Sequence, residues 1–346
     1  MKVDFIVIGN GLAGISFSEQ LRVHKKTFVV FDNASQQSST VAGGLYNPVV
    51  LKRFTPVWKS KEQLQIALDM YTALESKFNI KIDYKIPVLR KFVSSEEQND
   101  WFSASDKSML SEFLSTNLVK NHNASIDAPF GLGEVLQTGR IDVFTLIETY
   151  KSYLLKERGF FETEFLYDEL KILKDGFQYF DIKSKYIVFT EGYGIKKNKF
   201  FKDLPIVGTK GELLTIHAPD LKLDYVLKSA VFIIPLGNDL YKIGATYNWS
   251  DKNNNVTQEA KEELLSRLNG LIKCSYKVVD QVAGIRPTVK DRRPIVGQHA
   301  RHKNMFILNG LGTRGVMMGP YVAKQLFDLI ENGIPIDAEI DLKRFE

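Results

Sequence analysis

The hydrophobic pattern of the chain begins with a short apolar run, VDFIVI at residues 3–8, that is rich in β-branched residues and ends at a glycine. This is typical of a buried parallel strand. A helix is expected from about residue 12 to residue 23, and a second apolar strand, TFVVFD, ends at Asp32. The three segments predict a βαβ unit of about 30 residues.

Four longer segments have apolar positions at helical spacing, which predicts packing helices at residues 58–78, 142–159, 257–271 and 316–333. Between the first two, short strands and a polar helix are expected from residue 82 to residue 139. Residues 205–247 are rich in strand and turn signals. Further buried strands are expected near residues 186–190 and 304–309.

The order of these elements predicts the fold class. Strands of the dinucleotide-binding type occur at the start, near the middle and near the end of the chain, with mixed β material between them. We therefore expect an α/β protein, α+β overall, in which a mixed or antiparallel-sheet domain is inserted into a discontinuous Rossmann-like domain. The predicted Rossmann-like domain comprises residues 1–50, 141–205 and 280–346, and the inserted domain comprises residues 51–140 and 206–279.

Composition narrows the class of protein. With 44% hydrophobic and 25% charged residues, the 346-residue chain has the make-up of an ordinary globular protein. Its net charge of +5 comes from scattered lysines rather than from a basic cluster with aromatics, so nucleic-acid binding is not favoured. The single cysteine, Cys274, excludes an internal disulfide, and the histidines show no ligand spacing, so no metal site is expected. No apolar run is long enough for a signal peptide or membrane span, which predicts a cytoplasmic protein.

The first glycine-rich turn, GNGLAG at residues 9–14, has the G-x-G-x-x-G spacing and joins the first strand to the first helix. Such a turn holds a pyrophosphate at the helix N-terminus, while an acidic residue about 20 positions later accepts hydrogen bonds from the ribose. Asp32 fits that role and disfavours a 2′-phosphate. The glycines alone leave FAD and NAD open. The predicted cofactor contacts are Gly9, Asn10, Gly11, Leu12, Ala13, Gly14, Asp32 and Asn33.

The segment after Asp32, NASQQSSTVAGGLYNPVV, has neither helical nor strand period and is expected to be a functional loop. Its small residues allow the backbone to pass close to a large flat group. A flavin needs such a cradle and a nicotinamide does not, so this loop favours FAD. The predicted contacts here are Thr40, Ala42, Gly43 and Gly44.

The sequence resembles the D-amino acid oxidase and glycine oxidase superfamily of FAD-dependent oxidoreductases over nearly its whole length. The pieces that carry the resemblance, in order, are IGNGLAG, FD, STVAGGLYNP, IVFTEGYG, VGTKGELLTI, IIPLGNDLYKIGATYNW, GIRPTVKDRRPIVGQH and NMFILNGLGTRGVMMGP. The resemblance implies that the Rossmann-like domain binds FAD and that an antiparallel-sheet domain holds an amine substrate over the flavin.

The resemblance also implies four substrate-site residues. Arg286, in GIRP, matches the arginine that binds the substrate carboxylate, and Arg314 matches a second arginine before the last helix. A guanidinium grips a carboxylate with two hydrogen bonds and stays charged. For each arginine, a structural salt bridge is an alternative role. For Arg314, a contact to a phosphate or to the flavin edge is another. Tyr46 and Tyr247 match pocket-lining positions but are also compatible with ordinary core or rim aromatics.

The second glycine turn, NGLGTRGVMMGP at residues 309–320, is implied to direct a helix N-terminus at the flavin pyrimidine, where negative charge collects on reduction. The cofactor contacts implied from this part of the chain are Thr190, Gly192, Gly312, Thr313, Arg314, Gly315 and Val316. The branch of the superfamily that binds its flavin covalently has a cysteine near the GIRP segment. This chain has Ile285 and Arg286 there, which predicts non-covalent FAD. Glu191 stands where the family usually has a small residue, and the sequence offers no reason for it.

The activity implied by the resemblance is oxidation of the C–N bond of a small amino acid or secondary amine. Hydride passes to flavin N5, the imine hydrolyses, and O2 or another acceptor reoxidises the flavin. One alternative is an FAD oxidase acting on a carboxymethylaminomethyl uridine of tRNA, and another is a flavin-binding module without turnover. The substrate, its stereochemistry, the electron acceptor and the oligomeric state are left open at this point.

Overall fold

The computed structural model describes residues 1–345, which divide into two compact units. The first unit comprises Met1–Ala42, Val143–Thr209 and residues from Ile285 onward, and the second comprises Gly43–Asp142 and Lys210–Gly284. The chain passes from one unit to the other four times, and two of these passages fall within long strands, β15 (Ile206–His217) and β19 (Lys277–Val289). Residues 43–50 group with the second unit, although the sequence pattern suggested the first.

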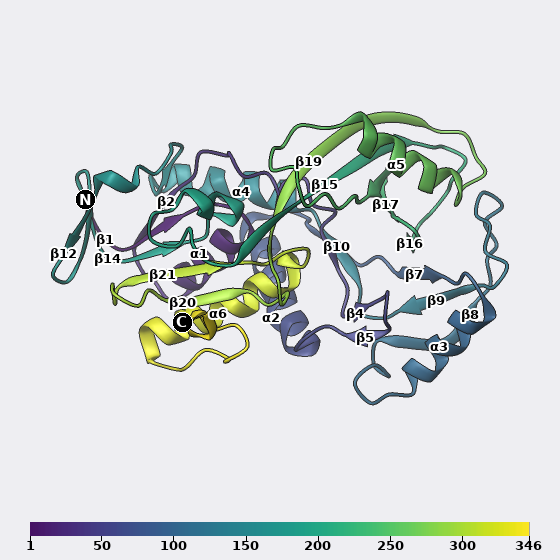
Figure 1. The fold of residues 1–346 in the computed structure, drawn as a ribbon, viewed down its shortest axis with the longest axis horizontal. Helices are drawn as coiled ribbons and strands as arrows, with labels where there is room; N and C mark the ends of the chain where they lie inside the picture. Colours follow the sequence, from purple (N-terminus) through teal and green to yellow (C-terminus); the bar gives the residue numbers. More distant parts are fainter. Residues whose placement is uncertain (346) are drawn as a thin grey trace. The chain divides into compact units, whose positions relative to one another are not determined.

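A mostly parallel sheet forms the centre of the first unit. Its parallel strands lie in the order β11, β2, β1, β14 and β21, and β20 pairs with β21 in the antiparallel sense. An antiparallel meander of β12 and β13 pairs with the first half of β14 (Figure 1). The bounds are β1 (Lys2–Ile8), β2 (Phe28–Phe31), β11 (Phe160–Phe161), β12 (Leu170–Leu173), β13 (Gly176–Tyr179), β14 (Ile182–Phe189), β20 (Ile295–Gln298) and β21 (Met305–Asn309).

Three α-helices accompany this sheet: α1 (Leu12–Val23), α4 (Val143–Lys156) and α6 (Gly315–Asn332). α1 and α6 pack together with their first residues side by side. A β-carbon at Gly315 would lie 3.0 Å from Leu12 Cδ1, and one at Gly319 would lie 2.9 Å from Ser16 Oγ. The glycines therefore let α6 lie close to α1, and the two helices, from opposite ends of the chain, run in the same direction.

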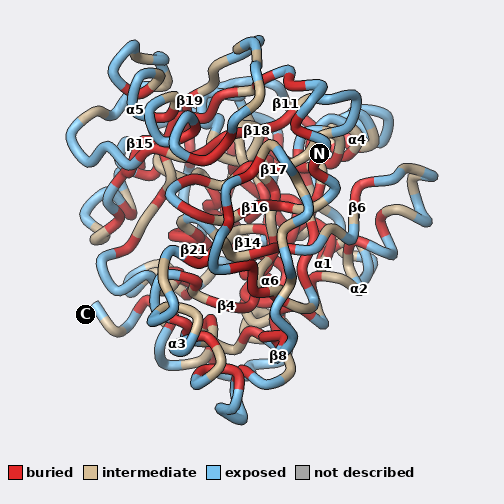
Figure 2. The backbone as a smooth tube through the Cα atoms, turned by 90° about the vertical axis from the view of Figure 1, so that its right-hand side faces the viewer, coloured by how far each residue is buried: buried red, intermediate tan, exposed pale blue. Residues whose placement is uncertain are grey.

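The core of the first unit consists of apolar side chains from the central strands. β1 and β14 are buried along most of their length. In Figure 2, exposed segments, in pale blue, lie mostly at the rim of the view, and buried segments, in red, lie mostly inside it. Phe31 stacks on Phe161 with ring centroids 4.7 Å apart, and Phe165 stacks on Tyr179 at 4.3 Å. The continuous apolar runs seen in the sequence are therefore strands of a parallel sheet covered on both faces.

The second unit contains an eight-stranded, mostly antiparallel sheet in the order β19, β15, β18, β17, β16, β7, β9 and β8. A small sheet, β3-β10-β6, and a two-stranded ribbon, β4-β5, complete its strands. The helices are α2 (Ser60–Phe78), α3 (Ser95–Ser105) and α5 (Gln258–Asn269). The remaining strands are β3 (Leu45–Tyr46), β4 (Val49–Val50), β5 (Thr55–Pro56), β6 (Asp83–Tyr84), β7 (Val88–Lys91), β8 (Leu114–Val119), β9 (Leu132–Val135), β10 (Gly139–Ile141), β16 (Val226–Lys228), β17 (Phe232–Gly237) and β18 (Leu240–Gly244).

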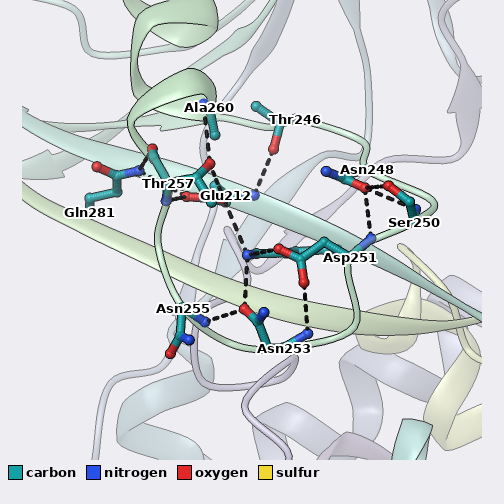
Figure 3. A network of polar contacts seen from close by, with 11 residues as sticks. Glu212, Thr246, Asn248, Ser250, Asp251, Asn253, Asn255, Thr257, Ala260 and Gln281 are labelled. Atoms are coloured by element: carbon teal, nitrogen blue, oxygen red, sulfur yellow. Dashed lines mark hydrogen bonds and ion pairs between the residues drawn. The ribbon is translucent and has the colours of Figure 1, made fainter.

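A buried polar network ties the loop before α5 to β15 (Figure 3). Lys210, which is 1% exposed, donates from Nζ to Asp251 at 2.5 Å and to Asn253 at 3.1 Å. Glu212 accepts from the backbone and hydroxyl of Thr257, whose hydroxyl also accepts from Ala260 N–H as the N-cap of α5. Each buried charge has partners, as burial of a charge requires.

The observed elements agree with the α/β architecture expected from the sequence. The expectation of an irregular loop at residues 33–50 is wrong in its second half, where β3 and β4 form. Two-residue strands are too short to show a period, so pairing rather than local pattern defines them: β3 pairs with the distant β10, and β4 pairs with the nearby β5. Within residues 1–345, no helix is both long and apolar enough to cross a bilayer.

Candidate functional site

Four parallel strands of the first unit end at one edge of their sheet. Ile8 pairs with Phe31 on one side and with Phe189 on the other, and Phe189 pairs with Ile307. Ligands of open α/β sheets bind outside these carboxyl ends. The chain continues from the four strands into Gly9, Asp32, Thr190 and Gly310. Both glycine turns singled out in the sequence therefore leave the same edge of one sheet.

The first turn is tightly packed around its glycines. Gly9 has φ of +107°, and a β-carbon there would lie 2.7 Å from the carbonyl oxygen of Thr190. A β-carbon at Gly14 would lie only 1.9 Å from Gly9 O. The hydroxyl of Thr190 donates to Ile8 O at 2.7 Å and lies 3.0 Å from Gly9 O. The turn thus brings the start of α1 against the ends of β1 and β14.

Asp32 and Asn10 provide polar groups at this turn. The Asp32 carboxylate accepts from Asn10 N–H and from Ala34 N–H, each at 2.6 Å. Asn10 is 5% exposed, and its side-chain oxygen has no hydrogen-bond partner within the described chain. A buried acceptor without a donor is costly unless a ligand supplies one. A ribose or phosphate-bearing ligand with hydroxyl donors fits this position.

The N-terminus of α1 has no side-chain cap from its own N-cap residue, Gly11, and no acidic residue in its first turn. Instead, Leu12 N–H donates to the hydroxyl of Ser39 at 3.2 Å. Ser39 was not among the predicted contacts, although it belongs to the quoted STVAGG piece. A serine hydroxyl and helix N–H groups are donors suited to a phosphate.

The second turn meets the GIRP segment. Gly312 N–H donates to Pro287 O at 3.0 Å, so the turn before α6 lies against the backbone of the residue that follows Arg286. Asn309, at the end of β21 and 1% exposed, donates from its side chain to Gly192 O at 2.9 Å. Arg314 is the N-cap of α6, whose first turn carries no acidic residue.

The structure thus brings most of the predicted cofactor contacts together in the first unit. Those around the first turn and the ends of β2 and β14 are Gly9, Asn10, Gly11, Leu12, Ala13, Gly14, Asp32, Thr190 and Gly192. Those of the second turn are Gly312, Thr313, Arg314, Gly315 and Val316. Asn33, Thr40 and Ala42 lie in the loop between β2 and β3. There Asn33 accepts from Ser35 N–H, and Thr40 donates to Gln37 O.

Arg286 also belongs to the first unit, whereas the predicted residues Gly43, Gly44, Tyr46 and Tyr247 belong to the second unit. Gly43 and Gly44 precede β3. Tyr46 is 2% exposed, and its hydroxyl donates to Asp83 at 2.8 Å. Burial, reinforced by Asp83, raises the pKa of Tyr46 well above its ordinary value. This is the setting of a core tyrosine, so we do not assign it to the substrate. Tyr247, by contrast, is 60% exposed.

Glu191 follows Thr190 and is held by side chains from two other segments. The hydroxyl of Tyr167 donates to one carboxylate oxygen, and Asn198 Nδ2 donates to the other at 2.7 Å. Burial raises the pKa of Glu191 to about 7, and these two hydrogen bonds oppose that rise. The glutamate thus anchors the segment that follows β14, which accounts for a residue that the sequence left unexplained.

We expect Glu191→Gln to change how stability depends on pH. The folded-state pKa lies above the ordinary value of 4.5, so the folded protein retains a proton that the unfolded chain releases, and stability falls as pH rises from about 4.5 to about 7. Glutamine removes this loss, because its oxygen accepts from Asn198 and its amide donates to the Tyr167 hydroxyl. Urea unfolding at pH 5 and pH 8 should show the variant gaining about 2 kcal/mol on the wild type. A pH-independent difference would contradict the assignment.

Comparison with known proteins decides the family. The family model described as "DAO: FAD dependent oxidoreductase" matches residues 4–329. The chain belongs to this family. It is therefore an FAD-dependent oxidoreductase, and the cofactor expected from the sequence is confirmed as FAD.

Individual members of the DAO family are similar over different shares of the chain. Glycine oxidase of Bacillus subtilis (strain 168) is 24% identical over 159 residues, which are 44% of this chain and 42% of that protein. The tRNA 5-methylaminomethyl-2-thiouridine biosynthesis bifunctional protein MnmC of Azoarcus sp. (strain BH72) is 24% identical over 45% of this chain and 28% of its own length. The matches to these curated relatives therefore span less than half of each relative.

Solved structures of the DAO family share the whole fold. The crystal structure of glycine oxidase from Geobacillus kaustophilus superposes with a TM-score of 0.80 at 18% identity, covering 100% of this chain and 98% of that one. Iminodiacetate oxidase from Chelativorans sp. BNC1 gives 0.77 at 14% identity, covering 97% and 98%. These likenesses establish the Rossmann-like FAD-binding fold expected from the sequence.

The residues at the sheet edge fit FAD. The first turn leaves no room for side chains at Gly9 and Gly14, the buried Asn10 oxygen lacks a donor, and Asp32 stands at the end of β2. Two helix N-termini without acidic first-turn residues start side by side. In residues 1–345, no cluster of three or more His, Cys, Asp or Glu side chains could hold a metal ion.

Proposed function

We propose that this DAO-family protein oxidises the C–N bond of a small amino acid or secondary amine to an imine, which then hydrolyses. The observation that carries the proposal is the hydrogen bond from Gly312 N–H to Pro287 O. It joins the turn that starts α6 to Pro287, the residue after Arg286, and arginine is a residue type that binds carboxylates. Both lie in the unit whose strand ends fit FAD.

Both ends of the chain would hold the cofactor. Gly9, Gly11 and Gly14 allow close approach to the pyrophosphate, and the N–H groups at the start of α1, with Ser39, provide phosphate donors. Asp32 accepts from the ribose hydroxyls. When bound, FAD would accept the two electrons that leave the substrate's α-carbon as hydride when the C–N single bond becomes an imine. The start of α6 would carry partial positive charge toward the flavin pyrimidine.

The protein's own contribution is orientation of the substrate. Arg286 is partly buried on β19, and its guanidinium would bind the substrate carboxylate through two parallel hydrogen bonds. This fixes the α-carbon relative to the cofactor and lowers the entropy cost of reaching the reactive geometry. Arg314, at the start of α6, would add a second positive charge. Tyr247 is a candidate rim residue because its ring is exposed.

FAD is proposed to be non-covalent and reoxidised by O2 or another acceptor. Cys274, the single cysteine, lies in the second unit. It stands eleven positions before Ile285, the residue that precedes Arg286 in the GIRP segment. No thiol therefore stands next to Arg286 in the sequence.

The proposal is tested by product analysis with an artificial electron acceptor, so that the natural acceptor need not be known. Both enantiomers of small amino acids and a series of N-substituted glycines are incubated with the FAD-loaded protein. We expect one or more to yield an oxo acid together with ammonia or a primary amine. If none yields product while FAD remains bound, the protein is a flavin-binding module without this turnover.

The similarity to MnmC supports a second candidate, oxidation of a carboxymethylaminomethyl group on a tRNA uridine. That activity would require the protein to bind tRNA through its basic residues, with affinity falling steeply as salt rises. Filter binding with bacterial tRNA at low salt separates the two candidates. Retention of tRNA favours this second function, and absence of retention removes it.

A further inference from the structure

The segment that leaves β14 contacts both glycine turns of the first unit. A β-carbon at Gly9, in the first turn, would lie 2.7 Å from the carbonyl oxygen of Thr190. Two positions after Thr190, Gly192 O accepts from Nδ2 of Asn309, the first residue of the second turn, at 2.9 Å. A shift of residues 190–192 would therefore displace both turns from the positions in which they fit FAD.

Asn309 uses both ends of its side-chain amide to join this segment to the second turn. Its Nδ2 donates to Gly192 O, and its Oδ1 accepts from Gly310 N–H at 2.7 Å. Asn309 is 1% exposed, so water does not compete for these bonds. Gly192 and Gly310 have φ of +55° and +77°, a backbone region that favours glycine. The amide thus sets the spacing between the chain segments that follow β14 and β21.

Glu191, inside the same segment, is held by two neutral side chains. Tyr167 donates its hydroxyl to one carboxyl oxygen, and Asn198 Nδ2 donates to the other at 2.7 Å. Asn198 is fully buried, and its Oδ1 accepts from Phe200 N–H at 2.8 Å, so the amide cannot turn without losing a bond. When the carboxyl carries a proton, that proton can be donated to the Tyr167 hydroxyl while the second oxygen still accepts from Asn198. The protonated acid therefore keeps both bonds.

The charged side chains around Glu191 are bonded to other groups. In the segment that follows it, the lysines bond to acids or to backbone carbonyls: Lys196 to Lys202 O and Leu204 O, Lys197 to Glu164, and Lys199 to Asp168. From the β20–β21 hairpin, His299 and His302 contact the rings of Phe200 and Phe201. Within residues 1–345, Glu191 forms no ion pair, so its negative charge, when present, is not neutralised locally.

We propose that Asn309 and the protonated carboxyl of Glu191 position the two glycine turns for FAD, and that loss of the Glu191 proton weakens FAD binding. Deprotonation places an unneutralised charge one residue from Thr190, which borders the phosphate-binding turn. That charge repels the pyrophosphate of FAD through surroundings of lower dielectric constant than water. Glu191 is thus a positioning residue and takes no part in the chemistry. The inference concerns the cofactor of the family, so it does not depend on which substrate is oxidised.

The proton linkage fixes the sign of the pH dependence. Burial raises the pKa of Glu191 to about 7, in spite of its two hydrogen bonds, so the carboxyl changes charge as the pH rises through neutrality. Since FAD binds more tightly to the protonated form, its affinity is highest below this range and falls as the pH rises through it. Bound FAD raises the same pKa further, because linked equilibria are reciprocal.

Titration of the apoprotein with FAD at about pH 6 and about pH 8, followed by flavin fluorescence, tests the inference without turnover. We expect wild-type protein to bind FAD about three- to tenfold more weakly at the higher pH. Glu191→Gln keeps both hydrogen bonds without the charge, so it should bind as tightly as the wild type at the lower pH and show no pH dependence. Glu191→Ala should bind about tenfold more weakly at both pH values. Equal wild-type affinity at the two pH values, or an unchanged pH dependence in Glu191→Gln, would overturn the inference.

His302→Gln is the matched control. The ring centroids of His302 and Phe200 lie 5.9 Å apart, and Phe200 bonds to the same Asn198 that holds Glu191. Histidine is the other type of side chain that changes charge near neutral pH. This variant should keep the wild-type pH dependence of FAD affinity. If His302→Gln removed that dependence, the effect would belong to the histidine and the role of Glu191 would be contradicted.

A double-mutant cycle at the lower pH tests whether Glu191 and Asn309 act on the same segment. If they do, Asn309→Ala should weaken FAD binding by a factor at least about threefold smaller in the Glu191→Ala background than in the wild type. Equal factors in the two backgrounds would show independent roles and contradict the joint one. Glu191→Gln, the smallest change, keeps the test decisive when an alanine variant does not fold.

Discussion

Gly14→Ala should leave the protein largely without FAD. The new β-carbon would lie 1.9 Å from Gly9 O and 3.0 Å from Thr190 Oγ1, and the nearer contact is to backbone that cannot rotate away. α1 must then move from the ends of β1 and β14, which carries its N-terminal N–H groups away from the phosphate position. Overpacking of this kind costs about 1–3 kcal/mol, so FAD affinity should fall by about 10- to 100-fold.

The ratio of flavin absorbance to protein absorbance after purification, followed by titration of the apoprotein with FAD, measures this loss. Gly159→Ala is the matched control in the same unit, because its β-carbon would meet nothing closer than Phe28 O at 3.5 Å. It should bind FAD like the wild type. Full FAD content in Gly14→Ala would mean that the first turn does not contact the cofactor.

Arg286→Met should abolish substrate oxidation and leave FAD bound. Losing two charge-assisted hydrogen bonds to the substrate carboxylate removes about 3–6 kcal/mol, or about 10²- to 10⁴-fold in kcat/KM. Arg286→Lys keeps the charge but not the planar fork, and should recover only part of the rate. Steady-state kinetics with the best amine give the size of the effect.

Arg301→Ala, at an exposed position of the same unit, provides the comparison and should be indistinguishable from the wild type. Loss of FAD together with activity in Arg286→Met would indicate a structural role for this arginine. Unchanged kcat/KM would exclude it from carboxylate binding.

The parts of the fold that could be predicted from the sequence are those set by local pattern. The βαβ unit and its turn follow from an apolar run, a glycine spacing and Asp32, all within the first 32 residues. The course of α6 beside α1 could not be predicted in this way. It depends on Gly315 and Gly319 meeting Leu12 and Ser16, which lie about 300 positions earlier in the chain.

The roles of the site residues also could not be predicted from local sequence pattern alone. The carboxylate of Glu191 is unusual in the sequence, but its partners Tyr167 and Asn198 are known only once the chain is folded. Tyr46 matched a pocket position, whereas its hydroxyl is bonded to Asp83. Burial and long-range pairing, which local spacing does not encode, decide these roles.

The central claim is that this DAO-family protein oxidises a small amine to an imine by removing hydride from the carbon next to the nitrogen. Anaerobic mixing of the FAD-loaded protein with amino acids of both configurations and with N-substituted glycines tests it most directly, because no electron acceptor is needed. We predict that at least one amine bleaches the visible flavin absorbance, at a rate that saturates with amine concentration and is lost in Arg286→Met. A flavin that stays oxidised with every amine, yet is bleached by dithionite, would contradict the account.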